Sequence, residues 1–201
     1  SAASDVYKRQ LLARALVMAF GAKPVIVCPD DSVQAIEKCA AVVGLHIYED
    51  LDTVQALPLS MGVVAFTKDI AAAPAQATEL AARKPAAVVS VEACGANAVG
   101  VCHNAVGLDV TALQARSDVL WDTLRANGVP NIAIGDLGNE IGMGTIAEHI
   151  KKYVPFTDKG ECQCDCGGGI LSATAADNII TATCSDWGCS VSYTHLRAHV
   201  T

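Results

Sequence analysis

Apolar residues along the chain gather into short runs, and most of the segments between them carry apolar positions at helical spacing. Short runs bounded by Gly, Pro and Asp are typical of buried strands, whereas a repeat of three to four residues is typical of amphipathic helices. The expected strands are residues 24–28, 45–48, 61–66, 85–91, 129–134, 161–166 and 178–184; the expected helices are 11–20, 33–43, 74–84, 111–127, which is the longest, and 145–152. Residues 50–60 are expected to form a loop. This alternation predicts an α/β protein, a three-layer sandwich with a mostly parallel sheet and helices on both faces.

The segment from Gly135 to Gly144 lies between an expected strand and an expected helix. In open parallel sheets ligands bind at the carboxyl ends of the strands, and a helix N-terminus there offers N–H groups to an anion. Asp136, Asn139 and Glu140 would meet such a ligand. The spacing matches neither the dinucleotide fingerprint nor a phosphate loop, which disfavours nucleotide binding. The long loop at 92–109, rich in Gly, Asn and Cys, follows another strand and is expected to join this site.

The composition narrows the choice of partner. The 201 residues are 52% hydrophobic and carry a formal net charge of −7, which disfavours nucleic acid and anionic membrane surfaces. No apolar run approaches the roughly 20 residues of a membrane span. We expect a small-molecule substrate, no nucleic acid, no membrane and a cytoplasmic location, and we leave a homo-oligomer open.

The two ends of the chain resemble translated sequencing adapters. We expect residues 1–10 and 191–201 to be non-native, and residues 11–190 to form a single α/β catalytic domain that is truncated at both ends. The nine cysteines, an odd number without a secretory signal, indicate a reducing compartment. Cys162, Cys164 and Cys166 would share one face of a strand, where packing is the favoured interpretation; a zinc site would need a partner such as Cys184 or Cys189.

Residues 134–144, Ile-Gly-Asp-Leu-Gly-Asn-Glu-Ile-Gly-Met-Gly, resemble the Gly-Asp-Gly-Gly-Asn-Glu-Ile-Gly-Met-Gly signature of the D-glutamate cyclase family. Residues 90–95 and 103–111 are similar to that family's Glu-containing strand end and its Asn-x-x-Gly-x-Asp/Glu-Ile loop, and residues 183–188 resemble its Ser-Asn-Trp-Gly motif. Three departures stand out: Leu137 replaces a glycine, Ala93-Cys94 replaces Arg-Pro, and Ala105-Val106 replaces Met-Arg. Two arginines that would be expected to bind substrate carboxylates are therefore missing.

The resemblance implies a lyase that converts D-glutamate to 5-oxo-D-proline and water, which needs a base, an acid and donors to an oxyanion. It implies Asp136, Glu140 and Asn139 as catalytic residues, with Asp136 and Glu140 sharing the roles of acid and base. The N–H groups of 138–142 would serve either the oxyanion or a substrate carboxylate. The implied substrate-binding residues are Gly135, Gly138, Gly142, Glu92, Asn104, Gly107, Asp186 and Trp187.

Other interpretations remain open at this point. Asp136, Glu140, Glu92 and Asp186 could instead hold a divalent cation, manganese or magnesium. The chain could also be a non-catalytic module that binds a small anion or amino acid, or a metal-dependent hydrolase of a related amide or lactam. His103 could act as an acid or base, although a surface or hydrogen-bonding role is favoured.

Overall fold

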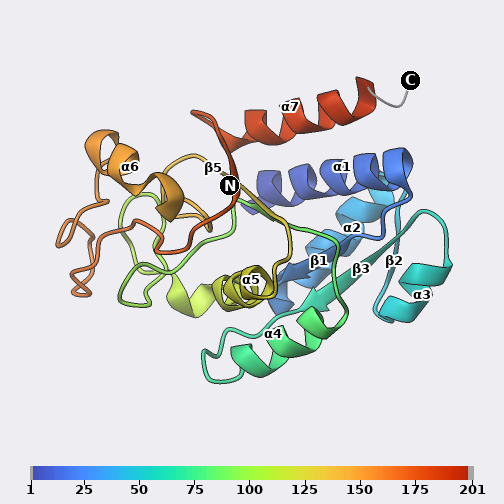
Figure 1. Ribbon diagram of the computed structural model, residues 1–201, viewed down its shortest axis with the longest axis horizontal. Coiled ribbons are helices and arrows are strands. Elements are labelled where there is room, and N and C mark those ends of the chain that lie inside the picture. Colours follow the sequence, from blue (N-terminus) through green and yellow to red (C-terminus); the bar gives the residue numbers. More distant parts are fainter. Residues whose placement is uncertain (1, 199–201) are drawn as a thin grey trace. The chain divides into compact units, whose positions relative to one another are not determined.

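The computed structural model describes the backbone of residues 2–198 and the side chains of residues 9–195 except that of Asp186. It divides into two compact units, residues 1–66 with 186–201 and residues 67–185. Figure 1 shows the helices and strands of both units, coloured along the sequence. No helix within the described residues is long and apolar enough to cross a membrane.

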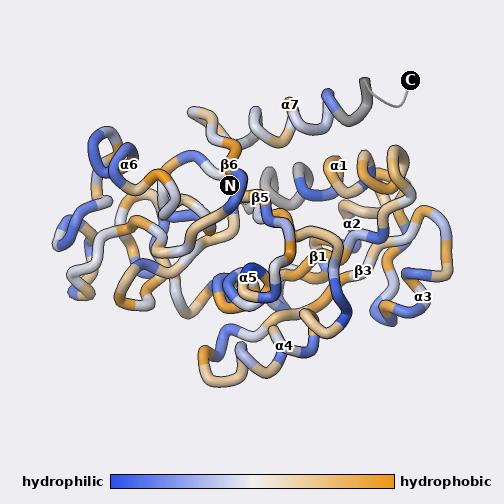
Figure 2. The backbone as a smooth tube through the Cα atoms, viewed as in Figure 1, coloured by the Kyte–Doolittle hydropathy of each residue, from blue (hydrophilic) through white to orange (hydrophobic). Residues whose placement is uncertain are grey.

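The first unit contains a parallel three-stranded sheet with the strand order β1-β3-β2. Its elements are α1 (Ala2–Phe20), β1 (Val25–Cys28), the 3-10 turn η1 (Asp30–Ser32), α2 (Val33–Val42), β2 (His46–Tyr48), α3 (Leu51–Ala56), β3 (Ser60–Ala65) and most of α7 (Ser185–Ala198). Figure 2 shows the hydrophobic colouring along the described part of α1.

Helices cover both faces of this first sheet. Met61 packs with buried residues of α1 and α2, among them Ala13, Val17 and Ala40. Successive residues of a strand point to opposite faces, so Gly62 faces α3 instead. A Cβ atom at Gly62 would lie 2.6 Å from Cδ2 of Leu51, which is why α3 can sit so close to β3.

The prediction that residues 50–60 form a loop is wrong, because α3 occupies Leu51–Ala56. The helix begins at Asp50, whose carboxylate accepts hydrogen bonds from the backbone N–H groups of Asp52 (3.2 Å) and Thr53 (3.0 Å). Such an N-cap satisfies donors that the first helical turn leaves unpaired.

The second unit contains another parallel sheet with the order β4-β5-β6. Its elements are α4 (Ala73–Ala82), β4 (Val88–Val91), η2 (Thr111–Leu113), α5 (Ser117–Ala126), β5 (Asn131–Gly135), η3 (Gly144–Ile146), α6 (Ala147–Tyr153) and β6 (Asn178–Thr181). Its core joins α5, β5 and α6 through a cluster of buried residues, namely Trp121, Ala133, Ile141, Met143, Ile150 and Ala176.

Two expected elements of this unit differ from the structure. The helix expected at 111–127 is broken into η2 and α5, because Gln114 is extended and the backbone N–H of Arg116 donates to the Thr67 carbonyl. The strand expected at 161–166 is absent, since this segment forms turns. The predicted α/β class with parallel strands is confirmed, and the six strands found among residues 2–198 form two sheets of three.

Candidate functional site

The Gly-rich turn after β5 lies against the loop that follows β4. The two strands are parallel neighbours, with Val91 opposite Ile134, so both leave the sheet at the same edge. Beyond the strands the pairing continues: the Ile141 N–H donates to the Ala93 carbonyl (2.8 Å), and the Gly95 N–H donates to the Asn139 carbonyl (2.9 Å). The sheet topology thus holds two loops side by side that are some 40 residues apart in the sequence.

Three carboxyl groups meet where these loops leave the sheet. Glu92, Asp136 and Glu140 each bring an oxygen atom within 4.8 Å of the others. Glu140 is buried, whereas Glu92 and Asp136 are half-buried. Glu92 also has a left-handed backbone with φ of +54°. A non-glycine residue in this conformation costs about 1–3 kcal/mol and is found preferentially at functional sites.

The Glu140 carboxylate is surrounded by the backbone of its own turn. Its Oε1 accepts from the N–H groups of Asp136 and Leu137, both at 3.1 Å, and its Oε2 accepts from that of Gly138 at 2.8 Å. Burial and the neighbouring Asp136 carboxyl raise the pKa of Glu140, against the opposing effect of these N–H donors. Glu140 therefore favours its protonated form more than an exposed glutamate does.

The glycines of the turn serve its folding. The N–H of Gly138 donates to Glu140, and that of Gly142 donates to Thr174 Oγ1 at 2.8 Å. These two donors are therefore occupied, and the expectation that they face an oxyanion does not hold in this structure. Gly135 makes room for the carboxyl group, because a Cβ there would lie 3.1 Å from Cδ of Glu140.

Asp136 and Asn139 are oriented by their neighbours. Oδ2 of Asp136 accepts from the Ser185 N–H at 3.1 Å. Nδ2 of Asn139 donates to the His103 carbonyl at 2.9 Å. The side chain of Asn139 therefore ties the turn to the loop after β4.

Asn104 and Gly107, two further expected binding residues, are engaged in hydrogen bonds with the loops around them. Asn104 Oδ1 accepts from the N–H groups of Val106 and Leu108 within its own turn, and the Gly107 carbonyl accepts from the Gln163 N–H. Asp186 and Trp187 belong to the first unit. The Trp187 side chain is 69% exposed, and the side chain of Asp186 lies outside the described residues.

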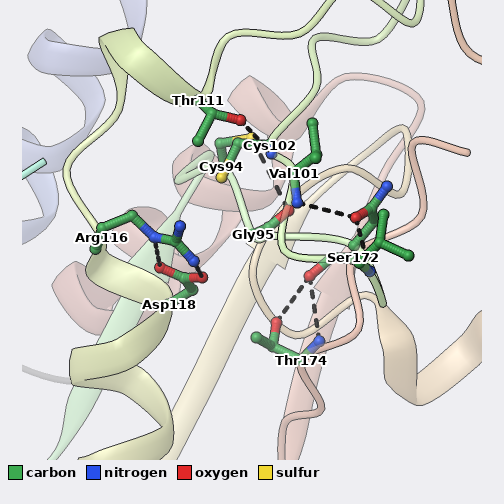
Figure 3. Close-up of polar contacts among 11 residues, drawn as sticks. Cys94, Gly95, Val101, Cys102, Thr111, Arg116, Asp118, Ser172 and Thr174 are labelled. Carbon is green, nitrogen blue, oxygen red and sulfur yellow. Dashed lines mark hydrogen bonds and ion pairs between the residues drawn. The ribbon is translucent and has the colours of Figure 1, made fainter. Parts of the chain in front are cut away.

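Figure 3 shows two buried polar pairs of this unit, Arg116 with Asp118 and Ser172 with Thr174. Arg116 and Asp118 form an ion pair in which Nη2 and Oδ2 are 2.6 Å apart, and Asp118 raises the pKa of Arg116. This guanidinium is engaged by Asp118 and does not replace the missing arginines. Ser172 and Thr174 share a hydrogen bond of 2.8 Å, and Oγ1 of Thr174 also accepts from the Gly142 N–H. Neither pair had a recognisable sequence signal, since both depend on contacts made by the fold.

Leu137, which replaces a signature glycine, is tolerated for a simple reason. It is not among the residues with positive φ, and its side chain is 39% exposed. A side chain at this position therefore meets no backbone strain of the left-handed kind and is partly in contact with solvent.

The three cysteines of the segment 162–166 meet His103 rather than Cys184 or Cys189. Nε2 of His103 lies 3.1 Å from Sγ of Cys164 and 3.5 Å from Sγ of Cys166. His103 is fully buried, so a surface role for it is wrong, whereas the hydrogen-bonding role that was expected as its alternative agrees with these contacts. Burial lowers its pKa, and the ring is neutral at neutral pH.

Comparisons with known proteins agree with the signature in the turn. Residues 10–199 match the family model described as D-glutamate cyclase-like, C-terminal. The chain is also 30% identical over 104 residues to the human protein D-glutamate cyclase, mitochondrial; this match covers 50% of the chain and 15% of the human protein. The chain therefore belongs to the D-glutamate cyclase-like family and corresponds to the part described as its C-terminal region.

Proposed function

We propose that this chain catalyses the conversion of D-glutamate to 5-oxo-D-proline and water. The observation that carries the proposal is the meeting of Glu92, Asp136 and Glu140 within 4.8 Å at the shared carboxyl edge of β4 and β5. Family membership supports a reaction of this class. The name of the human relative supports D-glutamate as the substrate.

The reaction joins the α-nitrogen to the carbon of the γ-carboxyl group and breaks one of the bonds between that carbon and oxygen. The ammonium group gives up two protons, the departing oxygen gains two, and no other reactant is needed. Asp136, half-buried and less enclosed than Glu140, is proposed as the base that takes a proton from the ammonium group. Glu140, whose buried carboxyl favours the protonated form, is proposed as the acid that protonates the departing oxygen.

The two carboxyl groups are close enough to share a proton, which suits a reaction that moves protons from nitrogen to oxygen. Each proton that Asp136 accepts can replace one that Glu140 donates, so that the pair returns to its initial state. Asn139 is proposed to position the turn through its bond to the His103 carbonyl. Glu92 is proposed to contact the substrate ammonium group, which a carboxylate attracts.

The same carboxyl groups are also candidate ligands for a divalent cation. Three backbone donors already occupy the Glu140 carboxylate, whereas the Asp136 carboxylate accepts one backbone N–H, that of Ser185. Manganese or magnesium accepts one or two carboxylates with water or substrate oxygens. Such an ion, when bound, would polarise the γ-carboxyl group and offset the negative charge that the site and the substrate share.

The test is 5-oxoproline formation from D- and L-glutamate by the full chain, with and without added manganese or magnesium. We expect turnover of D-glutamate that falls by about 10²–10⁴-fold in Asp136→Asn and Glu140→Gln, the usual contribution of a general acid or base. Glu148→Gln is the control, because that side chain is 93% exposed on α6.

Other outcomes would select the alternatives. Binding of D-glutamate by the folded chain without turnover, under every metal condition, would contradict the lyase proposal and favour a binding module. Hydrolysis of an amide or lactam that a chelator abolishes, without cyclisation of glutamate, would favour a metal-dependent hydrolase.

A further inference from the structure

A second cluster of ligand atoms lies outside the carboxyl site. His103, Cys162, Cys164 and Cys166 each bring one ligand atom to within 4.8 Å of the other three. His103 comes from the loop after β4, and the cysteines come from the long segment between α6 and β6. The cluster therefore joins two loops that are some 60 residues apart in the sequence.

The distances within the cluster correspond to the edges of a tetrahedron around one ion. With Zn–S near 2.3 Å and Zn–N near 2.05 Å, a tetrahedral site places sulfurs about 3.8 Å apart and nitrogen about 3.6 Å from each sulfur. The Sγ of Cys162 lies 3.5 Å from that of Cys166 and 3.8 Å from that of Cys164. The His103 Nε2 lies 3.1 Å and 3.5 Å from Cys164 and Cys166.

Neither disulfides nor apolar packing explains this arrangement. All nine cysteines are free, and the sulfurs stand well beyond the roughly 2.05 Å of a disulfide bond. Apart from these cysteines, residues 157–169 consist only of Thr, Asp, Lys, Gly, Glu and Gln. Such a segment has no aliphatic or aromatic side chains with which to build a core of its own.

The surroundings of the sulfurs suit thiolates. The Gly168 N–H donates to Sγ of Cys166 at 3.4 Å, and Nδ2 of Asn97 lies 3.6 Å from the same atom. Asn97 is only 3% exposed, and it also donates to the Gly169 carbonyl at 2.7 Å. Donors of this kind around a ligand sulfur are the outer contacts that fix and tune metal sites.

We propose that His103, Cys162, Cys164 and Cys166 bind one zinc ion in a closed tetrahedral site. Thiolate and imidazole ligands select zinc over the oxygen-preferring cations that suit the carboxyl cluster. Because the protein supplies all four ligands, no position remains for a substrate, and the role of the ion is structural. It fastens the segment 157–169 to the loop after β4 in place of a hydrophobic core.

The site also reaches the turn that carries the carboxyl groups. The His103 carbonyl accepts both from Nδ2 of Asn139 at 2.9 Å and from Sγ of Cys94 at 3.2 Å. Fixing the His103 imidazole on an ion therefore fixes the carbonyl to which Asn139 is bound. The inference itself stands on the ligand geometry and does not depend on the proposed reaction.

The experiment measures the metal bound to the full chain, purified from zinc-supplemented medium without chelators, by plasma mass spectrometry. We expect about one zinc per chain in the wild type, loss of it in Cys164→Ser and His103→Gln, and retention in Cys39→Ser on α2 and in Asp136→Asn. A folded wild-type chain that takes up no zinc, or one that carries iron or copper instead, would overturn the assignment, and so would zinc retained by both ligand variants.

Cobalt substitution covers the case in which the ligand variants do not fold. The wild-type chain loaded with Co²⁺ should show the intense visible absorption of a tetrahedral site together with thiolate-to-cobalt charge transfer, and added zinc should abolish both. A weak octahedral spectrum without charge transfer would contradict the site. Neither measurement requires turnover, so failure of the cyclase assay leaves this test intact.

Discussion

Replacing Gly142 by alanine tests whether the signature glycine serves packing. Gly142 has φ of +92°, and a Cβ there would lie 2.3 Å from the Ala133 Cβ and 3.0 Å from the Ala176 Cβ. Both are short, rigid side chains of the core cluster and cannot turn aside. Gly100 provides the matched control, since it has φ of +86° and nothing within 4 Å of an added Cβ.

The two substitutions share the cost of a left-handed alanine, and they differ in whether the added methyl group collides with packed neighbours. A left-handed alanine costs about 1–2 kcal/mol, partly offset by about 0.4–1 kcal/mol from the lower entropy of the unfolded chain, so Gly100→Ala should lose about 1 kcal/mol. Gly142→Ala adds overpacking of about 1–3 kcal/mol. We expect a total loss of about 2–4 kcal/mol in the free energy of unfolding.

The assay is urea unfolding followed by tryptophan fluorescence. Trp121 is 2% exposed and packs in the same cluster as Ala133, so its emission reports the unfolding of this core. Trp187→Phe serves as the background in every sample to remove the second tryptophan. With a urea slope of about 1–3 kcal/mol per molar, the midpoint of Gly142→Ala should fall by roughly 1 M or more. Equal losses for the two alanine variants would refute the packing argument.

Further predictions concern the ion pair, the buried carboxyl group and Leu137. Asp118→Asn should lower the free energy of unfolding by about 3–5 kcal/mol, because it leaves the Arg116 guanidinium buried without its counter-charge. The double variant Arg116→Met with Asp118→Leu should recover most of that loss, and a double variant less stable than Asp118→Asn in unfolding curves would contradict this. The raised pKa of Glu140 means that ionisation of this carboxyl group opposes folding. In metal-free buffer the wild type should therefore lose stability relative to Glu140→Gln as the pH rises. The loss should begin near the ordinary glutamate pKa of about 4.3 and end above the raised pKa of the folded state. A difference in unfolding free energy that stays constant with pH would contradict this assignment. Leu137→Gly should change the stability by no more than about 1 kcal/mol, because the Leu137 side chain is partly solvent-exposed and its φ is not positive. A larger loss in thermal unfolding would contradict this and show that the covered part of the side chain is closely packed.

The sequence determined those features that depend on short-range rules. Helix α2, strand β3 and the strand-turn-helix around residues 135–144 lie within a few residues of where hydrophobic spacing and Gly placed them, because periodicity and turn chemistry act over one or two turns of chain. The N-cap at Asp50 is a local signal of the same kind, but the polar residues that follow it in the segment 50–60 favoured a loop over the helix α3. The signature in the Gly-rich turn indicates the D-glutamate cyclase-like family from the sequence alone.

Only the tertiary structure decided which side chains meet. The division into two sheets, the break before α5, and the absence of a strand at 161–166 all follow from partners that lie far away in the sequence, such as Thr67 for Arg116 and His103 for Cys164. The Glu140 carboxylate is enclosed by the N–H groups of its own turn, and that turn is held against the loop after β4 by the hydrogen bond from Ile141 to Ala93. Local propensity carries no information on such contacts, because they cost chain entropy and form only when the whole unit folds.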